Sequence, residues 1–134
     1  MTIHTRRSVR LPGFDYSSAG AYSVTLVTAS RLCVFGCVAA DHLQPSVLGQ
    51  VVEDEWLATP SVRPGVTLGA FVVMPNHLHA IVWFPLTLTE PTQENSRTYR
   101  RTLGNLIAGF KSVVTRRHRD LVSDANAVVW QRGF

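Results

Sequence analysis

The sequence predicts an α+β domain in which two helices cover one face of a central antiparallel sheet of about four to five strands. Segments of alternating apolar and polar residues, typical of half-buried strands, flank a segment with helical spacing. Two strand patterns then follow one another directly, separated only by the turn residues Pro75-Asn76. With 134 residues, 46% of them hydrophobic, the chain is long enough to bury one core, so we expect residues 1–134 to form a single domain.

The first third of the chain supplies an arm and two strands. Residues 1–20 show little periodicity, which predicts a basic arm or loop. Residues 21–28 alternate and are rich in β-branched and aromatic side chains, as strands are. Residues 34–43 predict a second, weaker strand with an interruption at Gly36.

A helix and a strand pair follow. Pro45-Ser46 opens a helix that we expect to run to about Leu57, where Pro60 and Pro64 close it. Residues 66–74 and 78–84 are strongly apolar and predict two adjacent strands.

The last third predicts a loop, a long helix and a short strand. Residues 85–97 are polar and contain two prolines, as loops do. Residues 97–119 carry one apolar stripe at helical spacing. Residues 120–126 predict a loop, and residues 128–130 a short final strand. The resulting order, β-β-α-β-β-α-β, fits a ferredoxin-like α+β layout better than a doubly wound one, which needs a helix after nearly every strand.

Positive charge is concentrated in two segments, at the start of the chain and along the long helix. The net charge is +4, and twelve of the thirteen basic residues are arginine, whose planar guanidinium suits phosphate. One-sided positive charge is typical of nucleic-acid binding, although a solvated helix face explains the pattern equally well. The residues that we expect to contact DNA are Arg6, Arg7, Arg10, Arg97, Arg100, Arg101, Lys111, Arg116, Arg117 and Arg119.

The two cysteines, Cys33 and Cys37, lack the second pair that would complete a four-ligand zinc site, and His42 is a poor third ligand. We expect both to be small buried residues on neighbouring strand positions. The opening segment contains no apolar stretch typical of a signal peptide, and no apolar run reaches the roughly 18 residues that cross a bilayer. The sequence therefore predicts a cytoplasmic protein without a membrane segment.

The most informative segment is the strand that contains His77 and His79. Side chains alternate across a strand, so both imidazoles point to one face, while Leu78, Ala80 and Val82 point to the other, into a core. Two neighbouring imidazoles make a bidentate site for a divalent metal, and Mg, Mn and Zn all remain open at this point. Ordinary strand histidines are the alternative, but polar residues in an otherwise apolar central strand need a reason.

The segment VVMPNHLHAIVWF resembles the His-hydrophobe-His strand of the single-tyrosine transposases (insertion-sequence-200-like), in their REP-associated branch. The opening RRSVRLPGFDYSSAGAYSVTLVTASR is similar to that family's basic arm and first strand. VLGQVVEDEWLATPSVRPGVTLGAFVVMPNH resembles its first helix and next strand, LGNLIAGFKSVVTRR its second helix, and VVWQRGF its Trp-Gln-Arg segment. The likeness covers nearly the whole chain except the loop at 85–97.

The resemblance implies a metal-assisted reaction on single-stranded or hairpin DNA. His77 and His79 would hold Mg or Mn, which polarises the scissile phosphate. A tyrosine hydroxyl then attacks the phosphorus, which gives a 5′-phosphotyrosine and a free 3′-hydroxyl. In some relatives two chains pair and exchange their tyrosine helices, so a homodimer is one arrangement that the resemblance implies.

The catalytic tyrosine is the missing part of this pattern. The family carries it on a helix after the Trp-Gln-Arg segment, so we expect it beyond Phe134, in a part that this chain lacks through truncation. The tyrosines present are Tyr16, Tyr22 and Tyr99; Tyr99 is a weak candidate, because at the head of the basic helix it suits base stacking or surface packing better. We therefore expect a transposase domain that binds metal and DNA but is inactive alone. The alternative is a DNA-binding module that has lost catalysis.

Overall fold

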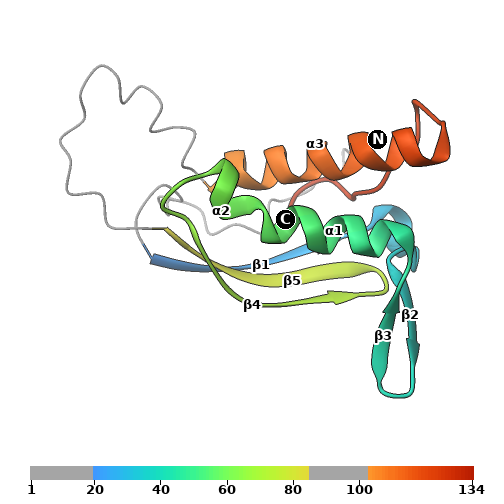
Figure 1. Ribbon diagram of the computed structural model, residues 1–134, viewed down its shortest axis with the longest axis horizontal. Coiled ribbons are helices and arrows are strands. Elements are labelled where there is room, and N and C mark those ends of the chain that lie inside the picture. The colour runs from blue at the N-terminus through green and yellow to red at the C-terminus, as the bar shows by residue number, and fades with distance from the viewer. Residues whose placement is uncertain (1–19, 85–102) are drawn as a thin grey trace, which may run out of the picture.

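The computed structural model describes residues 20–84 and 103–134. They form a sheet with two long helices packed on one face, and a β-hairpin that projects from the end of this assembly (Figure 1). The elements are β1 (Gly20–Val27), the short 3-10 helix η1 (Ala29–Arg31), β2 (Gly36–Ala39), β3 (His42–Pro45), α1 (Val47–Leu57), α2 (Thr59–Val62), β4 (Thr67–Met74), β5 (His77–Phe84) and α3 (Leu103–Val122).

The main sheet has the strand order β1-β5-β4, and both pairings are antiparallel. β5 is thus the central strand, bonded on both sides. Its register places Thr25 of β1 and Val72 of β4 on either side of His79. The predicted α+β class, with helices on one face of an antiparallel sheet, is confirmed. The five strands are divided between this three-stranded sheet and a separate two-stranded one.

The connections follow the ferredoxin-like order. α1 lies in the chain between β1 and β4, and α3 follows β5. The segment after α3 then returns to the free edge of β1, where Trp130 forms an antiparallel bridge to Thr28. Two hydrogen bonds support this contact, from Ala29 N to Val129 O and from Gln131 N to Val27 O, each 2.9 Å.

The predicted strand at 128–130 was wrong in extent, because the chain forms only that single bridge. The physical reason lies in the backbone carbonyls that a longer ladder would need. Those of Gln131 and Gly133 accept hydrogen bonds from the Lys111 ammonium, at 3.0 and 2.6 Å. The segment is therefore held to α3 rather than extended along β1.

The single weak strand predicted at 34–43 was also wrong. The chain reverses at Ala40 and Asp41, whose φ angles of 51° and 65° are those of a tight hairpin turn. β2 and β3 pair on either side of this turn, with Ala39 opposite His42. The prediction that Cys33 and Cys37 are buried was also wrong, because both are exposed in and next to this hairpin.

α1 begins directly after Ser46 and ends at Leu57, as the sequence predicted. The Ser46 hydroxyl accepts a hydrogen bond from Gly49 N at 3.0 Å and begins α1 as predicted. Pro60, expected to close the helical region, instead lies in the first turn of α2. Proline is tolerated there, because the backbone N–H that it lacks would have no partner within the helix. α3 runs three residues beyond the predicted end at Arg119. Its predicted start at 97 and the loop at 85–97 lie outside the described residues.

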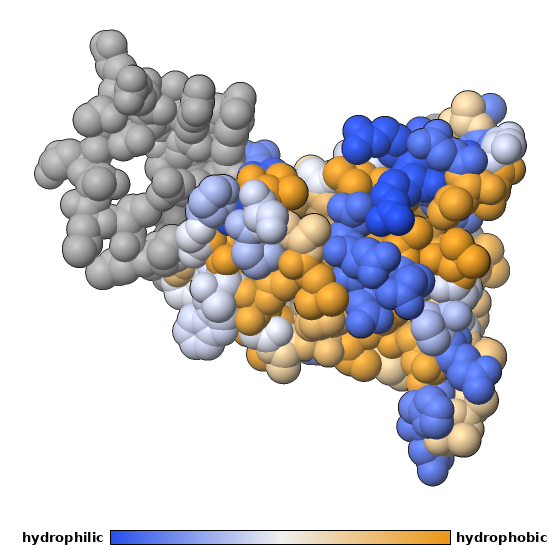
Figure 2. Space-filling view, in the orientation of Figure 1, coloured by the Kyte–Doolittle hydropathy of each residue, from blue (hydrophilic) through white to orange (hydrophobic). Residues whose placement is uncertain are grey.

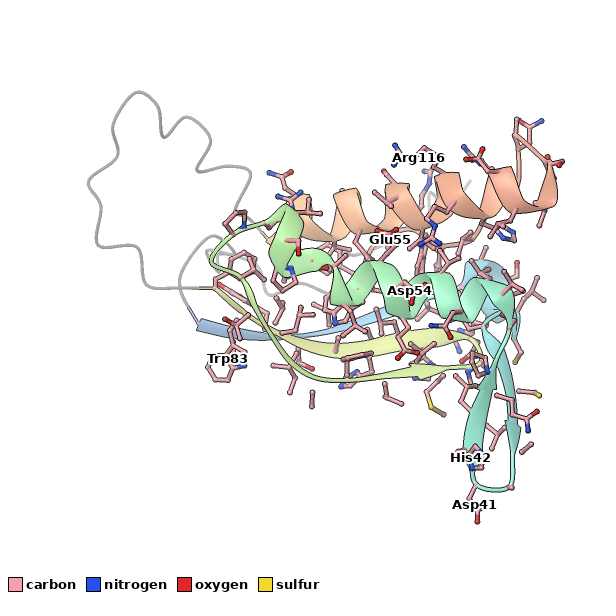
Figure 3. All side chains as sticks on the ribbon, viewed as in Figure 1. Asp41, His42, Asp54, Glu55, Trp83 and Arg116 are labelled. Atoms are coloured by element: carbon pink, nitrogen blue, oxygen red, sulfur yellow. The ribbon has the colours of Figure 1, made fainter. Side chains whose placement is uncertain are left out.

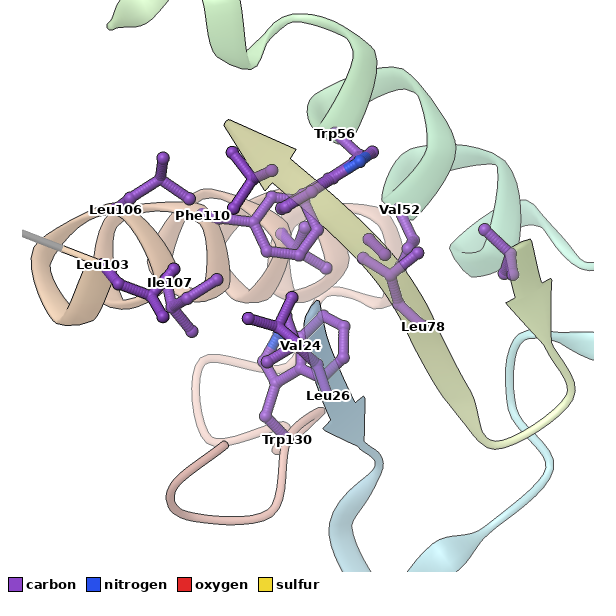
Figure 4. Packing of buried hydrophobic residues seen from close by; sticks show 14 of the residues in the cluster. Val24, Leu26, Val52, Trp56, Leu78, Leu103, Leu106, Ile107, Phe110 and Trp130 are labelled. Atoms are coloured by element: carbon purple, nitrogen blue, oxygen red, sulfur yellow. The ribbon is translucent and has the colours of Figure 1, made fainter. Parts of the chain in front are cut away.

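The core lies between the sheet and the two long helices (Figure 4). Trp56 of α1 and Phe110 of α3 meet edge to face, with ring centroids 5.2 Å apart. Phe110 also contacts Trp130 at 5.8 Å, and Trp130 contacts Phe35 at 5.3 Å. Trp130 is therefore a core residue. This aromatic chain ties the C-terminal segment to both helices.

None of the helices within residues 20–84 and 103–134 is long and apolar enough to cross a membrane.

Candidate metal centre

The two histidines of β5 lie on the face of the sheet that the helices leave open. Leu78, Ala80 and Val82 alternate with them and are fully buried against the helices. His77 is half-buried and His79 is exposed. The prediction that both imidazoles share one face of a central strand, opposite the core, is confirmed.

His79 is oriented by hydroxyl groups of the neighbouring strand. Its register partner on β1 is Thr25, whose Oγ1 lies 2.8 Å from His79 Nδ1. Ser23 Oγ lies 3.4 Å from Nε2, a longer and weaker contact. When Nδ1–H donates to Thr25, Nε2 presents its lone pair to the open face, which is the arrangement a metal-ligating histidine needs.

His77 is oriented from within the turn that precedes it. Its Nδ1 lies 2.8 Å from Asn76 Oδ1, and a carboxamide oxygen only accepts, so Nδ1 carries the proton. Asn76 is itself fixed, since its backbone carbonyl accepts from the Thr28 amide at 3.0 Å and from the Thr28 hydroxyl at 3.2 Å. The buried Thr28 thereby connects the histidine turn to the bridge with Trp130. Both histidines keep Nε2 for a ligand.

The residues present fit a divalent metal with two nitrogen ligands and open positions. Two imidazoles suit Mn, and also Zn, better than Mg, which prefers oxygen. No group of three or more His, Cys, Asp and Glu side chains gathers anywhere in the described ranges. Within the described residues His77 and His79 are therefore the candidate metal ligands, and Cys33, Cys37 and His42 do not gather into a zinc site.

The basic residues of α3 lie on the other side of the sheet, on the helical layer. Figure 3 shows Arg116 there and Trp83, which is on the histidine strand, on the opposite side. Figure 2 shows hydrophilic side chains gathered over α1 and the C-terminal half of α3. The structure thus does not bring Lys111, Arg116, Arg117 or Arg119 together with the histidine pair.

Three of these four side chains have partners within the protein. Arg117 forms an ion pair with Glu55 of α1 at 2.9 Å. Arg119 Nε donates to Ala127 O at 2.9 Å, and Lys111 holds the carbonyls of the C-terminal segment. Burial lowers the pKa of the Lys111 ammonium, whose charge lies 6.0 Å from the centre of the Trp130 ring. Arg116 is exposed.

A groove of about 1210 Å³ runs between α3 and the C-terminal segment. Arg116, Arg119 and Arg132 line it together with Lys111, so its walls carry positive charge. Within the described residues, the basic side chains of α3 are accessible to an anion along this groove. The remaining predicted DNA contacts, Arg6, Arg7, Arg10, Arg97, Arg100 and Arg101, lie outside the described residues.

The sequence did not identify the residues that orient the histidines. Thr25 lies 54 positions from His79, and only the register of β1 with β5 makes them neighbours. Asn76 was visible as a turn residue, but its side chain also fixes the proton on the next residue. A turn asparagine directly before a strand histidine was the one available signal.

A relative exists in Haemophilus influenzae, named as an uncharacterized protein. It is 33% identical over 145 residues, and the match covers 98% of this chain and 77% of the relative. No protein-family model matches the sequence. The relative's sequence therefore supports a shared fold along almost the whole of this chain.

Replacing Thr25 by Val is expected to weaken Mn binding roughly 10- to 100-fold, because the hydroxyl that contacts His79 Nδ1 and orients the ring is lost while the shape is kept. Isothermal titration calorimetry measures this affinity. Ser23→Ala is the matched control and should change it little, since its contact is long. Equal affinities for wild type and Thr25→Val would contradict the orienting role.

Replacing Lys111 by Ala is expected to destabilise the fold by about 1–2 kcal/mol, because two carbonyls lose a charged donor at a half-exposed position. Urea unfolding measures the change. Arg116→Ala, an exposed change on the same helix, should stay within about 0.5 kcal/mol of wild type. A Lys111 variant as stable as Arg116→Ala would show that the ammonium does not hold the C-terminal segment.

Proposed function

We propose that this chain, which belongs to the same family as the uncharacterized Haemophilus influenzae protein, is a DNA nicking-and-joining domain of the single-tyrosine transposase type. The observation that carries the proposal is the pair His77 and His79 on the open face of the central strand, each with Nδ1 engaged by a neighbouring side-chain oxygen. The resemblance of nearly the whole sequence to the single-tyrosine transposases supports the proposal.

In this proposal the Nε2 atoms of His77 and His79 hold Mn or Mg. The metal, when bound, supplies the Lewis acid that polarises a phosphodiester oxygen of single-stranded DNA. Thr25 and Asn76 contact the Nδ1 atoms of the two imidazoles and would orient the rings toward the ligand. His77 is half-buried and His79 is exposed, so a metal and DNA would both be able to reach the imidazoles from the open face of the sheet.

The nucleophile limits what this chain does alone. Within the described residues Tyr22 is the single tyrosine, and it is buried on the core face against Phe84, with ring centroids 5.6 Å apart. Such a hydroxyl cannot reach a phosphate at the histidines on the opposite face. Tyr16 and Tyr99 lie outside the described residues. We therefore propose that this chain binds metal and single-stranded or hairpin DNA without forming the 5′-phosphotyrosine by itself.

The second candidate is a single-stranded or hairpin DNA-binding module that has lost catalysis. The buried position of Tyr22 favours it, since none of the described residues offers a tyrosine hydroxyl on the histidine face. The two candidates share the metal centre and differ in whether a covalent adduct forms when a tyrosine is supplied, by Tyr99 or by a second chain.

The metal centre is tested by replacing His77 and His79 together by Ala. We expect Mn binding to be lost, because the described residues gather no other group of ligands. His42→Ala, at the exposed tip of the β2–β3 hairpin (Figure 3), is the matched control and should bind Mn like wild type. Calorimetry with Mn alone reads the result, and retained affinity in the double variant would rule out this centre.

The DNA activity is tested by incubating the protein with Mn and a labelled single-stranded hairpin. We expect a mobility shift without a covalent adduct that survives denaturing electrophoresis. An adduct would instead establish catalysis by this chain, and its loss in Tyr99→Phe would identify the nucleophile. If neither a shift nor an adduct forms at low salt, where phosphate contacts are strongest, the proposal of DNA binding fails.

A further inference from the structure

Trp83 lies on the open face of the sheet, in line with the histidines. It follows His79 by four residues on β5, so the alternation of the strand places both on the same side, roughly 13 Å apart along it. Figure 3 shows the indole extending away from the helices. Half of its surface is exposed, whereas Trp56 and Trp130 are buried in the core.

The neighbours of Trp83 are small, which keeps the indole accessible. Its partners across the strands are Ala21 on β1 and Thr67 on β4. Gly69 of β4 lies beneath its edge, and a Cβ at that position would come within 3.2 Å of Trp83 Nε1 and 3.0 Å of Ile81 Cβ. The absence of a side chain at Gly69 therefore gives the indole room to lie against the strand.

The described strands also give the open face no acidic side chain that would repel a phosphate backbone. The three strands of the sheet, β1, β4 and β5, contain neither Asp nor Glu. Beside Trp83 this face presents the hydroxyls of Ser23 and Thr25 and the two imidazoles. An aromatic plane, hydrogen-bonding groups and no carboxylates are the features of surfaces that bind single-stranded nucleic acid by stacking.

We propose that Trp83 is a stacking platform for one unpaired base of the DNA strand whose phosphate lies at His77 and His79. This inference rests on the proposed function. It adds the path of the bound DNA strand, which would run along β5 from the histidine pair toward Phe84. It also predicts a preference for single strands, because a base inside a duplex has no free face for the indole.

The test uses the whole chain with Mn and two probes, a short fluorescein-labelled oligothymidylate and a duplex that contains the same strand. Anisotropy gives the affinity of each. Trp83→Ala is expected to lower affinity for the single strand roughly 5- to 150-fold, and Trp83→Phe to lower it less, because a smaller ring still stacks. Tryptophan fluorescence adds a direct readout, since Trp83 is the exposed indole and its emission should fall when the oligonucleotide binds.

Val47→Ala is the control, an exposed apolar residue on α1, on the other side of the sheet, and should leave DNA affinity within about twofold of wild type. Mn affinity should be the same in all variants, which shows that the centre is intact. If Trp83→Ala binds the oligonucleotide like wild type, the platform is overturned while the metal and DNA proposals stand. If the wild type binds Mn but no DNA, the proposed DNA function and the stacking role of Trp83 are both wrong. If Trp83→Ala changes only the oligomeric state in size-exclusion chromatography, the indole contacts a second protein chain instead.

Discussion

The position of β5 between β1 and β4 is the constraint on which the rest of the structure depends. Because both of its edges are paired, its side chains can point only to the two faces of the sheet. Leu78, Ala80 and Val82 fill the helical side and form the floor of the core. The histidines are thereby held on the other side, with a backbone that cannot turn them away. A single strand thus supplies both the core and the candidate metal centre.

The helices on the core face explain why much of the positive charge serves the fold. α1 carries acidic and no basic residues, whereas basic residues predominate on α3, and the pair Arg117–Glu55 joins the two helices over the sheet. Lys111 and Arg119 hold the carbonyls of the C-terminal segment, which needs them because it pairs with β1 at one position only. The side chains of Lys111, Arg117 and Arg119, which resemble a DNA-binding stripe in the sequence, therefore form contacts within the protein. On the described part of the helical layer, the exposed Arg116 and the groove that it lines remain accessible to an anion.

The same arrangement separates two surfaces with different chemistry. The helical side is charged, whereas the open side of the sheet holds imidazoles, hydroxyls, Val72 and the half-exposed Trp83. A strand of DNA bound at the histidines would therefore meet hydrogen-bonding and stacking groups first, and arginines only where it passes around an edge of the sheet. Under the proposed function, affinity for DNA at the histidine pair would depend on ligand geometry and stacking more than on salt-sensitive phosphate contacts.

By itself the sequence determined the class of fold, the capped start of α1, the core face of β5 and the shared face of His77 and His79, because these follow from local periodicity and capping. It misjudged residues 34–43, where Ala40 adopts a positive φ that alanine seldom signals. It also misjudged the extent of the strand at 128–130, just beyond which the Lys111 ammonium binds the carbonyls of Gln131 and Gly133. Only the tertiary structure decided which residues orient the histidines, since Thr25 reaches His79 through a pairing between distant strands. It also decided which cations stay available, because an arginine's partner is set by the packing of another helix and not by its own neighbours in the chain.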